Sequence, residues 1–372
     1  MVHPRALNLG RSAPPLVIEL ADELSEGSRP HLESAFQALG AHLQAGFPPG
    51  VAAAVCGTAG VLGRAWGGWA KLPPRGIPVG ADTLFDLASL TKVMATTPLC
   101  LRLEQAAAWS LDDPVQRWVD GFHHPTITLR HCLTHTSGLP AHKPFWELAD
   151  SPAAIRIALF EVEPDAPPGK RVVYSDLNFI LLGWAVENCG GQSLDVLCRE
   201  HVLSPLAMMG SGYRPPATHR SRIAATEVWG EVHDENARAL GGVSGHAGLF
   251  APLDDVVKFA HSLVASDRHP GVAPYQPPDP SRPRIGAPPE VRGLGWRLQP
   301  MAIAPGWPDD AYGHTGFTGT SVLVAPSSGL AAVLLSNAVH PKRRLNGAAS
   351  LRADFHRALL PLLESPRSKP GS

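Results

Sequence analysis

The sequence predicts an α+β fold, in which an antiparallel sheet is flanked by N- and C-terminal helices and carries an inserted, mainly helical subdomain. Three observations support this prediction. A candidate hairpin occupies residues 51–70, strand patterns return only after residue 296, and the chain between about residues 98 and 240 is helical and rich in loops. Strands at both ends with helices between them imply that the first hairpin pairs with the last strands in one antiparallel sheet.

The N-terminal elements are an arm, a helix and the hairpin. Residues 1–29 are rich in proline and charge without strong periodicity, so we expect a poorly ordered arm. The next segment should form an amphipathic helix that ends near Gly46, because four apolar residues recur at helical spacing: Leu32, Phe36, Leu39 and Leu43. The runs 51–56 and 61–70, joined by a turn at 57–60, predict the hairpin.

The middle of the chain is predicted to be an insertion. Helical spacing of apolar residues recurs after Tyr174 and after Gly191, and we place the inserted helical subdomain at residues 98–240. The sheet subdomain would then consist of residues 30–97 and 241–365. Within it, residues 247–263 are predicted to be a loop that leads into a helix.

The C-terminal part is predicted to return to strands. Residues 269–290 contain eight prolines and are expected to form an ordered loop or a flexible insertion. Strand patterns follow at residues 296–299, 318–325 and 329–337. Helical periodicity at residues 345–363 predicts a last helix, which should cover the sheet together with the first one.

The composition argues against two classes of partner. The 372 residues carry 32 Lys and Arg against 33 Asp and Glu, so no excess of basic residues favours nucleic acid or an anionic membrane surface. The sequence has no stretch near 18 consecutive strongly apolar residues, which argues against a membrane span. With 44% apolar residues the chain can bury one large core or two subdomains that share an interface, and its oligomeric state stays open.

We predict a cytoplasmic location. The first residues lack the uninterrupted apolar segment of a secretory signal, and acidic residues follow from Glu19 onward. The five cysteines are odd in number and widely spaced, which fits reduced thiols better than a disulfide framework. These are Cys56, Cys100, Cys132, Cys189 and Cys198.

The run from Ser89 to Lys92 can turn an ordinary hydroxyl into a nucleophile. Side chains three residues apart lie on one face of a helix, so the two are within reach of each other. A serine hydroxyl is a poor nucleophile until a base takes its proton, and a lysine half-buried among apolar neighbours can have its pKa lowered enough to serve. Free N–H groups in the first helical turn could also face a developing oxyanion.

Two further motifs follow in a fixed order, Tyr-Ser-Asp at residues 174–176 and His-Thr-Gly at residues 314–316. With Ser-x-x-Lys before them they resemble the serine β-lactamase and penicillin-binding protein superfamily. Supporting runs at 133–140, 245–250 and 293–296 look like its class C β-lactamase-related branch, which includes D-Ala-D-Ala carboxypeptidases and esterase-like serine hydrolases. The resemblance spans about residues 50–363 and implies a β-lactamase/transpeptidase-like fold, with the active site between sheet and insertion.

The resemblance also implies roles for particular residues. Ser89 would be the acylated nucleophile, and Lys92 and Tyr174 would take its proton and pass it to the leaving group. The backbone N–H groups of Ser89 and Phe317 would form the oxyanion hole. Residues 314–316 should lie on an edge strand facing the nucleophile, where His314 and Thr315 would contact substrate and Gly316 would permit a close approach.

Two positions depart from the usual family pattern. Asp176 stands where an asparagine is common, and its carboxylate would either disfavour anionic substrates or stabilise Lys92 as a cation. Asn178 could supply the missing amide, or it could face the opposite side of its turn. His314 replaces the lysine of β-lactamases, and because histidine is mostly neutral at pH 7 it would anchor a substrate carboxylate less strongly.

The remaining histidines give weaker signals. His131 and His135 have helical metal-ligand spacing, but no carboxylate or cysteine completes a site, and we interpret both as structural. The glycine-rich run at residues 241–248 lacks the lysine of a phosphate-binding loop, so we expect it to line the cleft, with His246 as a substrate contact. The predicted chemistry needs neither a metal nor an organic cofactor.

Three functional hypotheses follow. The first is a serine hydrolase that forms an acyl-Ser89 intermediate on small-molecule esters or amides, with esterase activity foremost. The second is a D-Ala-D-Ala carboxypeptidase or D-amino-acid peptidase acting on muropeptide fragments. The third is a catalytically silent ligand sensor, which has no need of Ser89, Lys92 and Tyr174 together.

Overall fold

A computed structural model describes residues 13–265, 291–300, 303–344 and 348–364 of the chain. Its main element is an antiparallel sheet with the strand order β1-β3-β2-β12-β11-β10-β9-β8, and β4 pairs with β3 beside it. The strands are β1 (Val17–Leu20), β2 (Gly50–Gly57), β3 (Gly60–Lys71), β4 (Ile77–Pro78), β8 (Val291–Arg292), β9 (Arg297–Leu298), β10 (Tyr312–Thr315), β11 (Ser321–Ala325) and β12 (Leu330–Ser336). Strands β2 and β12 pair from Val51 with Ser336 to Gly57 with Leu330, which confirms that the first hairpin joins the last strands.

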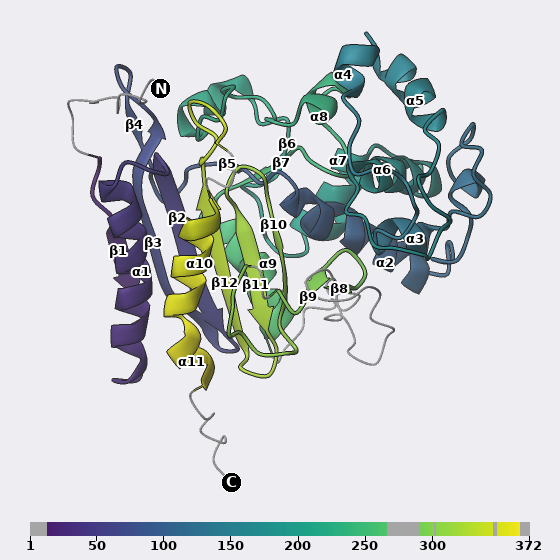
Figure 1. Cartoon of the computed structure of the whole chain (residues 1–372). Helices are drawn as coiled ribbons and strands as arrows, with labels where there is room; N and C mark the ends of the chain where they lie inside the picture. Colours follow the sequence, from purple (N-terminus) through teal and green to yellow (C-terminus); the bar gives the residue numbers. More distant parts are fainter. Residues whose placement is uncertain (1–12, 266–290, 301–302, 345–347, 365–372) are drawn as a thin grey trace, which may run out of the picture.

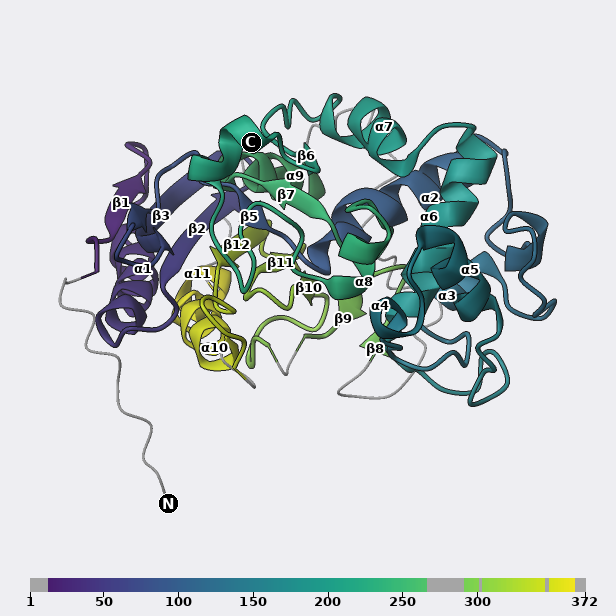
Figure 2. The ribbon, with the colours of Figure 1, turned by 90° about the horizontal axis from the view of Figure 1, so that it is seen from above.

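Helices cover both faces of this sheet (Figures 1 and 2). Helix α1 (Ser28–Gln44) packs beside α10 (Ala349–Ala358) and α11 (Leu360–Glu364) on one face, and α9 (Leu253–Val264) contacts the central strands from the other. Side chains alternate along β2 between the two faces, as a pleated strand requires. Val51, Ala53 and Val55 join the core under α1, whereas Ala52, Ala54 and Cys56 join the core on the α9 side.

The chain between β5 and β7 is mainly helical and lies beside the sheet (Figure 1). It contains α2 (Thr97–Gln105), α3 (Leu129–Leu133), α4 (Phe145–Leu148), α5 (Pro152–Phe160), α6 (Asp176–Gly190), α7 (Leu194–Cys198) and α8 (Glu235–Ala239). A small second sheet of order β5-β7-β6 joins β5 (Phe85–Asp86), β6 (Gly212–Tyr213) and β7 (Leu249–Ala251). The domain limits at residues 97/98 and 240/241 stay a prediction.

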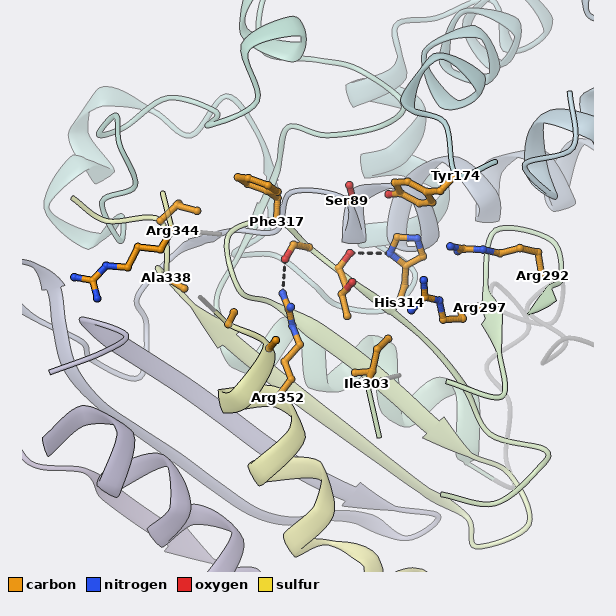
Figure 3. A pocket seen from close by; sticks show the side chains of 15 residues that line it. Ser89, Tyr174, Arg292, Arg297, Ile303, His314, Phe317, Ala338, Arg344 and Arg352 are labelled. Carbon is orange, nitrogen blue, oxygen red and sulfur yellow. Dashed lines mark hydrogen bonds between the residues drawn. The ribbon is translucent and has the colours of Figure 1, made fainter. Parts of the chain in front are cut away.

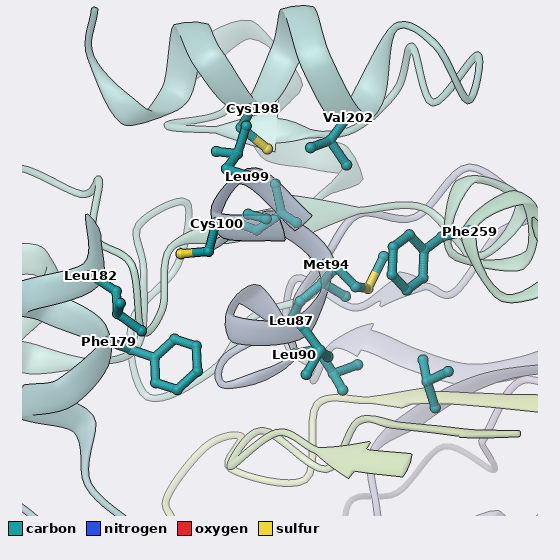
Figure 4. Close-up of a cluster of buried hydrophobic side chains, with 14 of the residues drawn as sticks. Leu87, Leu90, Met94, Leu99, Cys100, Phe179, Leu182, Cys198, Val202 and Phe259 are labelled. Carbon is teal, nitrogen blue, oxygen red and sulfur yellow. The ribbon is translucent and has the colours of Figure 1, made fainter. Parts of the chain in front are cut away.

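The segment that follows β5 is anchored in the larger core (Figure 4). Leu87, Leu90 and Met94 are all under 1% exposed and pack with Phe179 of α6 and Phe259 of α9 in one cluster. The residues between Leu87 and Met94 are therefore fixed by packing against both the helical region and the helix that covers the sheet. Ser89 lies in this segment.

The N-terminal arm is better ordered than we predicted. Residues 1–12 lie outside the described part, but Val17–Leu20 form strand β1, which pairs with β3 from Val17 with Trp66 to Leu20 with Gly63. The physical reason is that β3 would otherwise expose a row of unpaired backbone groups along the sheet edge. Arg64 of β3 also donates to Glu19 across the pair at 2.7 Å.

Other sequence expectations have simpler outcomes. The helices predicted after residue 30 and near residue 253 are confirmed as α1 and α9, and the C-terminal helix is divided into α10 and α11. The proline-rich segment 269–290 lies outside the described residues. Within the described ranges, no helix is long and apolar enough to cross a membrane, and all five cysteines are free.

The packing of α10 on α1 leads to a stability prediction. The Phe355 side chain is 0% exposed and stacks on Phe36 with 6.2 Å between ring centroids. We expect Phe355→Ala to lower the free energy of unfolding by about 3–5 kcal/mol, because it leaves a cavity between the helices. Urea denaturation measures this change. Arg357→Ala on the same helix, with 61% of its side chain exposed, should stay within about 0.5 kcal/mol of the parent, and equal losses for both variants would contradict the account.

Candidate active site

Ser89 lies on a tight turn directly after β5. Ala88 before it has a φ of 47°, a backbone conformation that residues other than glycine rarely adopt. The turn is closed by the Leu90 N–H, which donates to the Leu87 carbonyl at 3.1 Å. The buried carboxylate of Asp86 accepts the N–H of Ala88 at 2.8 Å and that of His233 at 2.7 Å, so it holds the unusual backbone in place.

Lys92 begins a short π-helix (Lys92–Thr96) that continues into α2, and its side chain is completely buried. The Nζ atom donates to three oxygens, one for each N–H of an ammonium group. These are Ser89 Oγ at 2.8 Å, Asp176 Oδ1 at 2.8 Å and the backbone carbonyl of His246 at 3.2 Å. The predicted contact between Ser89 and Lys92 is therefore present.

The charge state of Lys92 differs from our prediction. Burial acts to lower the pKa of this ammonium, but the negative charge of Asp176 and the phenol of Tyr174 outweigh it and raise the pKa above its usual 10.5. Burial likewise acts to raise the pKa of Asp176, and Lys92 together with His142 brings it well below its usual range. Lys92 is thus a cation with no lone pair to accept a proton, as one of the two roles expected for Asp176 implies, and the lowered pKa that we predicted for Lys92 is wrong.

Asp176 occupies the first position of α6, where sequence alternatives were left open for its carboxylate and for the Asn178 amide. It contacts Lys92, as the second of the two expected roles for its carboxylate requires. Asn178 does not replace the missing amide. Its side chain is fully buried, and its Oδ1 accepts from the Ser137 hydroxyl at 2.6 Å.

Tyr174 is held beside Lys92 by neighbours that the sequence did not reveal. The Nζ of Lys92 lies 5.0 Å from the centroid of the phenol ring, and the ring of His135 lies 4.6 Å from it. The Nδ1 of His135 accepts the N–H of Ser175 at 3.1 Å, which fixes the turn into α6. His131 caps α3 through Thr128, so both histidines that we interpreted as structural do form structural contacts.

His314 and Thr315 end β10 and Gly316 follows directly, but β10 is not an edge strand. Strand β9 follows it in the sheet and pairs with Tyr312 and Gly313 only, so His314 and Thr315 extend beyond this short neighbour. The close approach expected of Gly316 is present. A Cβ added there would lie 2.4 Å from the Leu87 carbonyl oxygen, beside the turn that carries Ser89.

Two backbone N–H groups are available where the oxyanion hole was expected. Among the residues that the structure describes, neither Ser89 nor Phe317 donates its N–H to a backbone acceptor. The loop that carries Phe317 is tied to the Ser89 turn by two hydroxyls. Thr318 donates to the Asp86 carbonyl at 2.8 Å, and Thr320 donates to the Leu87 carbonyl at 3.1 Å.

A cavity of about 400 Å³ opens at Ser89 (Figure 3). Tyr174, His314 and Phe317 lie along one side of it, and Ile303 and several small apolar residues line the rest. Four of its described lining residues are arginines and none is acidic: Arg292, Arg297, Arg344 and Arg352. The described lining of the cavity therefore carries positively charged side chains and no negatively charged one, a cationic wall that fits an anionic group.

Burial and nearby positive charges determine the state of His314. Burial, together with the nearby charges of Arg292 and Lys92, holds the pKa of this imidazole well below its usual value of 6.5. His314 is therefore neutral, as its ordinary pKa led us to expect. Its ring is 3% exposed, and its Nδ1 faces the Thr315 carbonyl at 2.9 Å.

His246 differs from its predicted role as a substrate contact. Its ring is 1% exposed and held between two protein partners, with Nδ1 2.8 Å from the Ser244 hydroxyl and Nε2 2.8 Å from Asp234. It contributes its backbone carbonyl to Lys92 instead. The glycine-rich run suggested a loop in the cleft, but nothing in the run indicated which atoms of His246 face Lys92.

Three residues near the site carried no recognisable sequence signal. They are His142, whose Nδ1 lies 3.6 Å from Asp176 Oδ2, the buried Asp86, and Arg352 of α10. His142 and Arg352 reach the site from segments without a local motif, and Asp86 lies three residues before Ser89 but outside the Ser-x-x-Lys pattern. In the described ranges, no group of three or more His, Cys, Asp or Glu side chains is placed to hold a metal ion.

Comparison with known proteins identifies related chains. The family model described as Beta-lactamase matches residues 33–356. The "Putative D-alanyl-D-alanine carboxypeptidase" of Escherichia coli O157:H7 is 29% identical over 329 residues, which cover 75% of this chain and 76% of that protein. The protein of the same name from Escherichia coli strain K12 is 28% identical over the same shares.

Solved structures share the fold at low sequence identity. "A class C beta-lactamase" aligns with a TM-score of 0.75 and 18% identity over 94% of this chain and all of its own. "EstCE1, a hydrolase with promiscuous acyltransferase activity" aligns with a TM-score of 0.74 and 19% identity over 90% of this chain and all of its own. A "Beta-lactamase/D-alanine Carboxypeptidase" from Yersinia pestis aligns with a TM-score of 0.66 and 19% identity, over 91% of this chain and 98% of that one.

The Asp176–Lys92 pair leads to a pH-dependent stability prediction. The pKa of Asp176 is lowered in the folded state, whereas its unfolded value is about 3.9. Its stabilising contribution is therefore fully present above about pH 4 and is lost as the pH falls toward the folded pKa. We expect Asp176→Asn to lower the free energy of unfolding at pH 7 by about 3–5 kcal/mol, because it leaves a buried ammonium without its carboxylate.

Urea denaturation at several pH values measures this effect, and the difference from the parent should shrink below about pH 4. Asp254→Asn is the matched control, since it removes a half-exposed carboxylate that pairs with Arg64 on the protein surface. That variant should lose no more than about 1 kcal/mol. Equal denaturation midpoints for Asp176→Asn and the parent at pH 7 would refute the buried ion pair.

Proposed function

We propose that this chain, which belongs to the Beta-lactamase family and is a serine hydrolase, cleaves small amides or peptides that carry a carboxylate on the leaving side, as a carboxypeptidase does. The observation that carries the proposal is the cavity beside Ser89, whose described lining contains four arginines and no acid. One of the four, Arg352, already donates to two backbone carbonyls, so it adds charge to the cavity. A carboxylate matches guanidinium groups in charge and in hydrogen-bond geometry. The relatives named D-alanyl-D-alanine carboxypeptidase support the same substrate class.

In the proposed acylation step, Ser89 Oγ attacks the substrate carbonyl carbon and loses its proton. Lys92 already donates to this hydroxyl and remains a cation, so it stabilises the negative charge that develops on Oγ. We assign the proton to the phenol oxygen of Tyr174, whose ring lies beside that cation. The phenol then gives the proton to the leaving nitrogen as the carbonyl–nitrogen bond breaks.

The tetrahedral intermediate needs two donors for its oxyanion. The N–H groups of Ser89 and Phe317 are the proposed pair, and the hydroxyls of Thr318 and Thr320 hold the two loops that present them. Water then attacks the acyl-Ser89 ester, transfers a proton through the same groups and releases the acid. The two half-reactions consume one water and restore the serine hydroxyl.

A second candidate is an esterase with no need of a carboxylate on its substrate. Two observations favour it. His314 is neutral, so the His-Thr-Gly run provides no cation of its own, and EstCE1, a hydrolase with promiscuous acyltransferase activity, is among the structural neighbours. The two candidates share the acyl-Ser89 step. They differ in whether the arginine-lined cavity binds a carboxylate of the substrate.

The first expected result concerns the nucleophile. Intact-protein mass spectrometry after exposure to a fluorophosphonate or to p-nitrophenyl acetate should show one covalent adduct on the parent chain and none on Ser89→Ala. The reason is that Ser89 is the hydroxyl paired with a buried cation. An adduct of equal yield on the variant would overturn the assignment of Ser89. No adduct on either chain would favour the silent ligand sensor.

The substrate class is tested with a matched pair, N-acetyl-D-Ala-D-Ala and its C-terminal carboxamide. We expect kcat/KM to be at least about tenfold higher for the carboxylate, because only that form offers a charge to the arginines. Release of the terminal residue measures both rates. Equal rates on the pair, together with fast turnover of p-nitrophenyl acetate, would instead establish the esterase.

A further inference from the structure

The loop between β10 and β11 depends on a buried arginine that belongs to another element. Arg352 of α10 donates from Nη2 to the Gly316 carbonyl at 2.6 Å and from Nε to the Thr320 carbonyl at 3.2 Å. One guanidinium thus joins both ends of the loop. The Gly316 N–H also donates to the Thr320 carbonyl at 2.8 Å, so the two ends are closed on each other as well.

The hydrogen bond from Arg352 to the Gly316 carbonyl orients the peptide unit whose N–H is the proposed oxyanion donor. The carbonyl of Gly316 and the N–H of Phe317 belong to the same peptide plane, and in a trans peptide they point in opposite directions. A donor that fixes the carbonyl toward α10 therefore fixes the N–H toward the other side of the loop. Figure 3 shows Arg352 and Ser89 on opposite sides of the chain at this point.

The charge of Arg352 adds a second effect. A hydrogen bond from a cation draws electron density toward the carbonyl oxygen and makes the N–H of that peptide a stronger donor, as in hydrogen-bond chains that polarise one another. No carboxylate ion pair with Arg352 is present among the described residues, and burial lowers the pKa of the guanidinium to about 10, so it stays charged at neutral pH. Within the described part of the chain, no neighbouring acid cancels its charge.

We propose that Arg352 is a positioning residue of the oxyanion hole, which orients and polarises the Gly316–Phe317 peptide so that the Phe317 N–H faces the oxyanion. This inference rests on the proposed acylation of Ser89. It assigns Arg352 a task apart from the binding of a substrate carboxylate, because two of its donors are already used on backbone carbonyls.

Arg344 provides a matched control for this role. It lines the same cavity and carries the same charge, but its guanidinium lies over the Phe47 ring, 4.8 Å from the centroid. Removing it changes the cationic wall without touching the loop. If cavity charge alone speeds acylation, variants of both arginines should be slower. If Arg352 acts through the Gly316–Phe317 peptide, its variants should lose more of the rate than those of Arg344.

The test uses p-nitrophenyl acetate, which has no carboxylate, so that recognition of a leaving-group anion does not enter. We expect Arg352→Met to lower the acylation rate constant by about tenfold to a hundredfold with little change in KM, since loss of one oxyanion donor costs about a hundredfold or more. Arg352→Lys should recover most of this loss, because it keeps a charged donor. Arg344→Met should lose less of the acylation rate than Arg352→Met, because it removes a cavity charge without touching the loop. Arg357→Met, on the exposed side of α10, should acylate at the rate of the parent.

Phenylboronic acid gives a readout that is independent of turnover, because its adduct on a serine is tetrahedral and places an oxygen at the oxyanion position. Its affinity should fall in Arg352→Met by the same factor as the acylation rate. Where Arg352→Met does not fold, Arg352→Gln keeps a neutral donor and should show an intermediate loss in both measurements. Circular dichroism and thermal melting identify the folded variants.

Two outcomes overturn the inference while leaving the proposed function intact. One is an acylation rate at the parental level in folded Arg352→Met and Arg352→Gln. The other is an equal loss in Arg344→Met, which would assign the effect to the charge of the cavity wall. A parent chain that forms neither the acetyl nor the boronate adduct would instead refute the acylation of Ser89 on which the inference rests.

Discussion

The buried ion pair between Lys92 and Asp176 is the interaction on which the site depends. Lys92 has no exposed surface, and an ammonium so placed is costly unless charge and hydrogen bonds compensate it. Asp176 supplies the charge, and Ser89 and the His246 carbonyl accept the remaining two N–H groups. The pair therefore determines both the position of Ser89 and the protonation state of its neighbour. In the mechanism that we propose, this leaves Tyr174 as the group that accepts the proton.

The fold brings these groups together from segments that are distant in sequence. The Ser89 turn follows β5, Asp176 begins α6, and the His246 carbonyl belongs to the loop before β7. On the opposite side, the loop after β10 is held against the Ser89 turn by two threonine hydroxyls and against α10 by Arg352. The nucleophile is consequently fixed from the helical region, and the proposed oxyanion donor is fixed from the sheet. The distance between the nucleophile and the proposed oxyanion donor therefore depends on how the helical region and the sheet are packed together.

The sequence predicted those features that depend on local patterns. The hairpin, its pairing with β12 and the contact of Ser89 with Lys92 follow from alternation and helical spacing, and they are confirmed. The sequence left two roles open for Asp176, which lies 84 residues from Lys92, and its contact with Lys92 makes the lowered pKa that we predicted for this lysine wrong. The edge position of β10 was wrong because the short strands β8 and β9, which follow it in the sheet, carry little pattern. Arg352 lies 36 residues from the Gly316 carbonyl that it binds, and no motif in α10 marks it. Contacts of charged side chains with groups distant in sequence are thus the part of the site that local spacing alone does not predict.

The central claim is that Lys92 is a cation in the resting enzyme. Nitrogen-15 NMR of the chain labelled in its lysine side chains measures this directly, with the Lys92 signal assigned by its absence from Lys92→Arg. The account predicts an Nζ chemical shift typical of an ammonium that stays constant from about pH 6 to about pH 9, because Asp176 holds the pKa above its usual value. An Nζ shift typical of a neutral amine at about pH 7 would contradict the account and would make Lys92 the base.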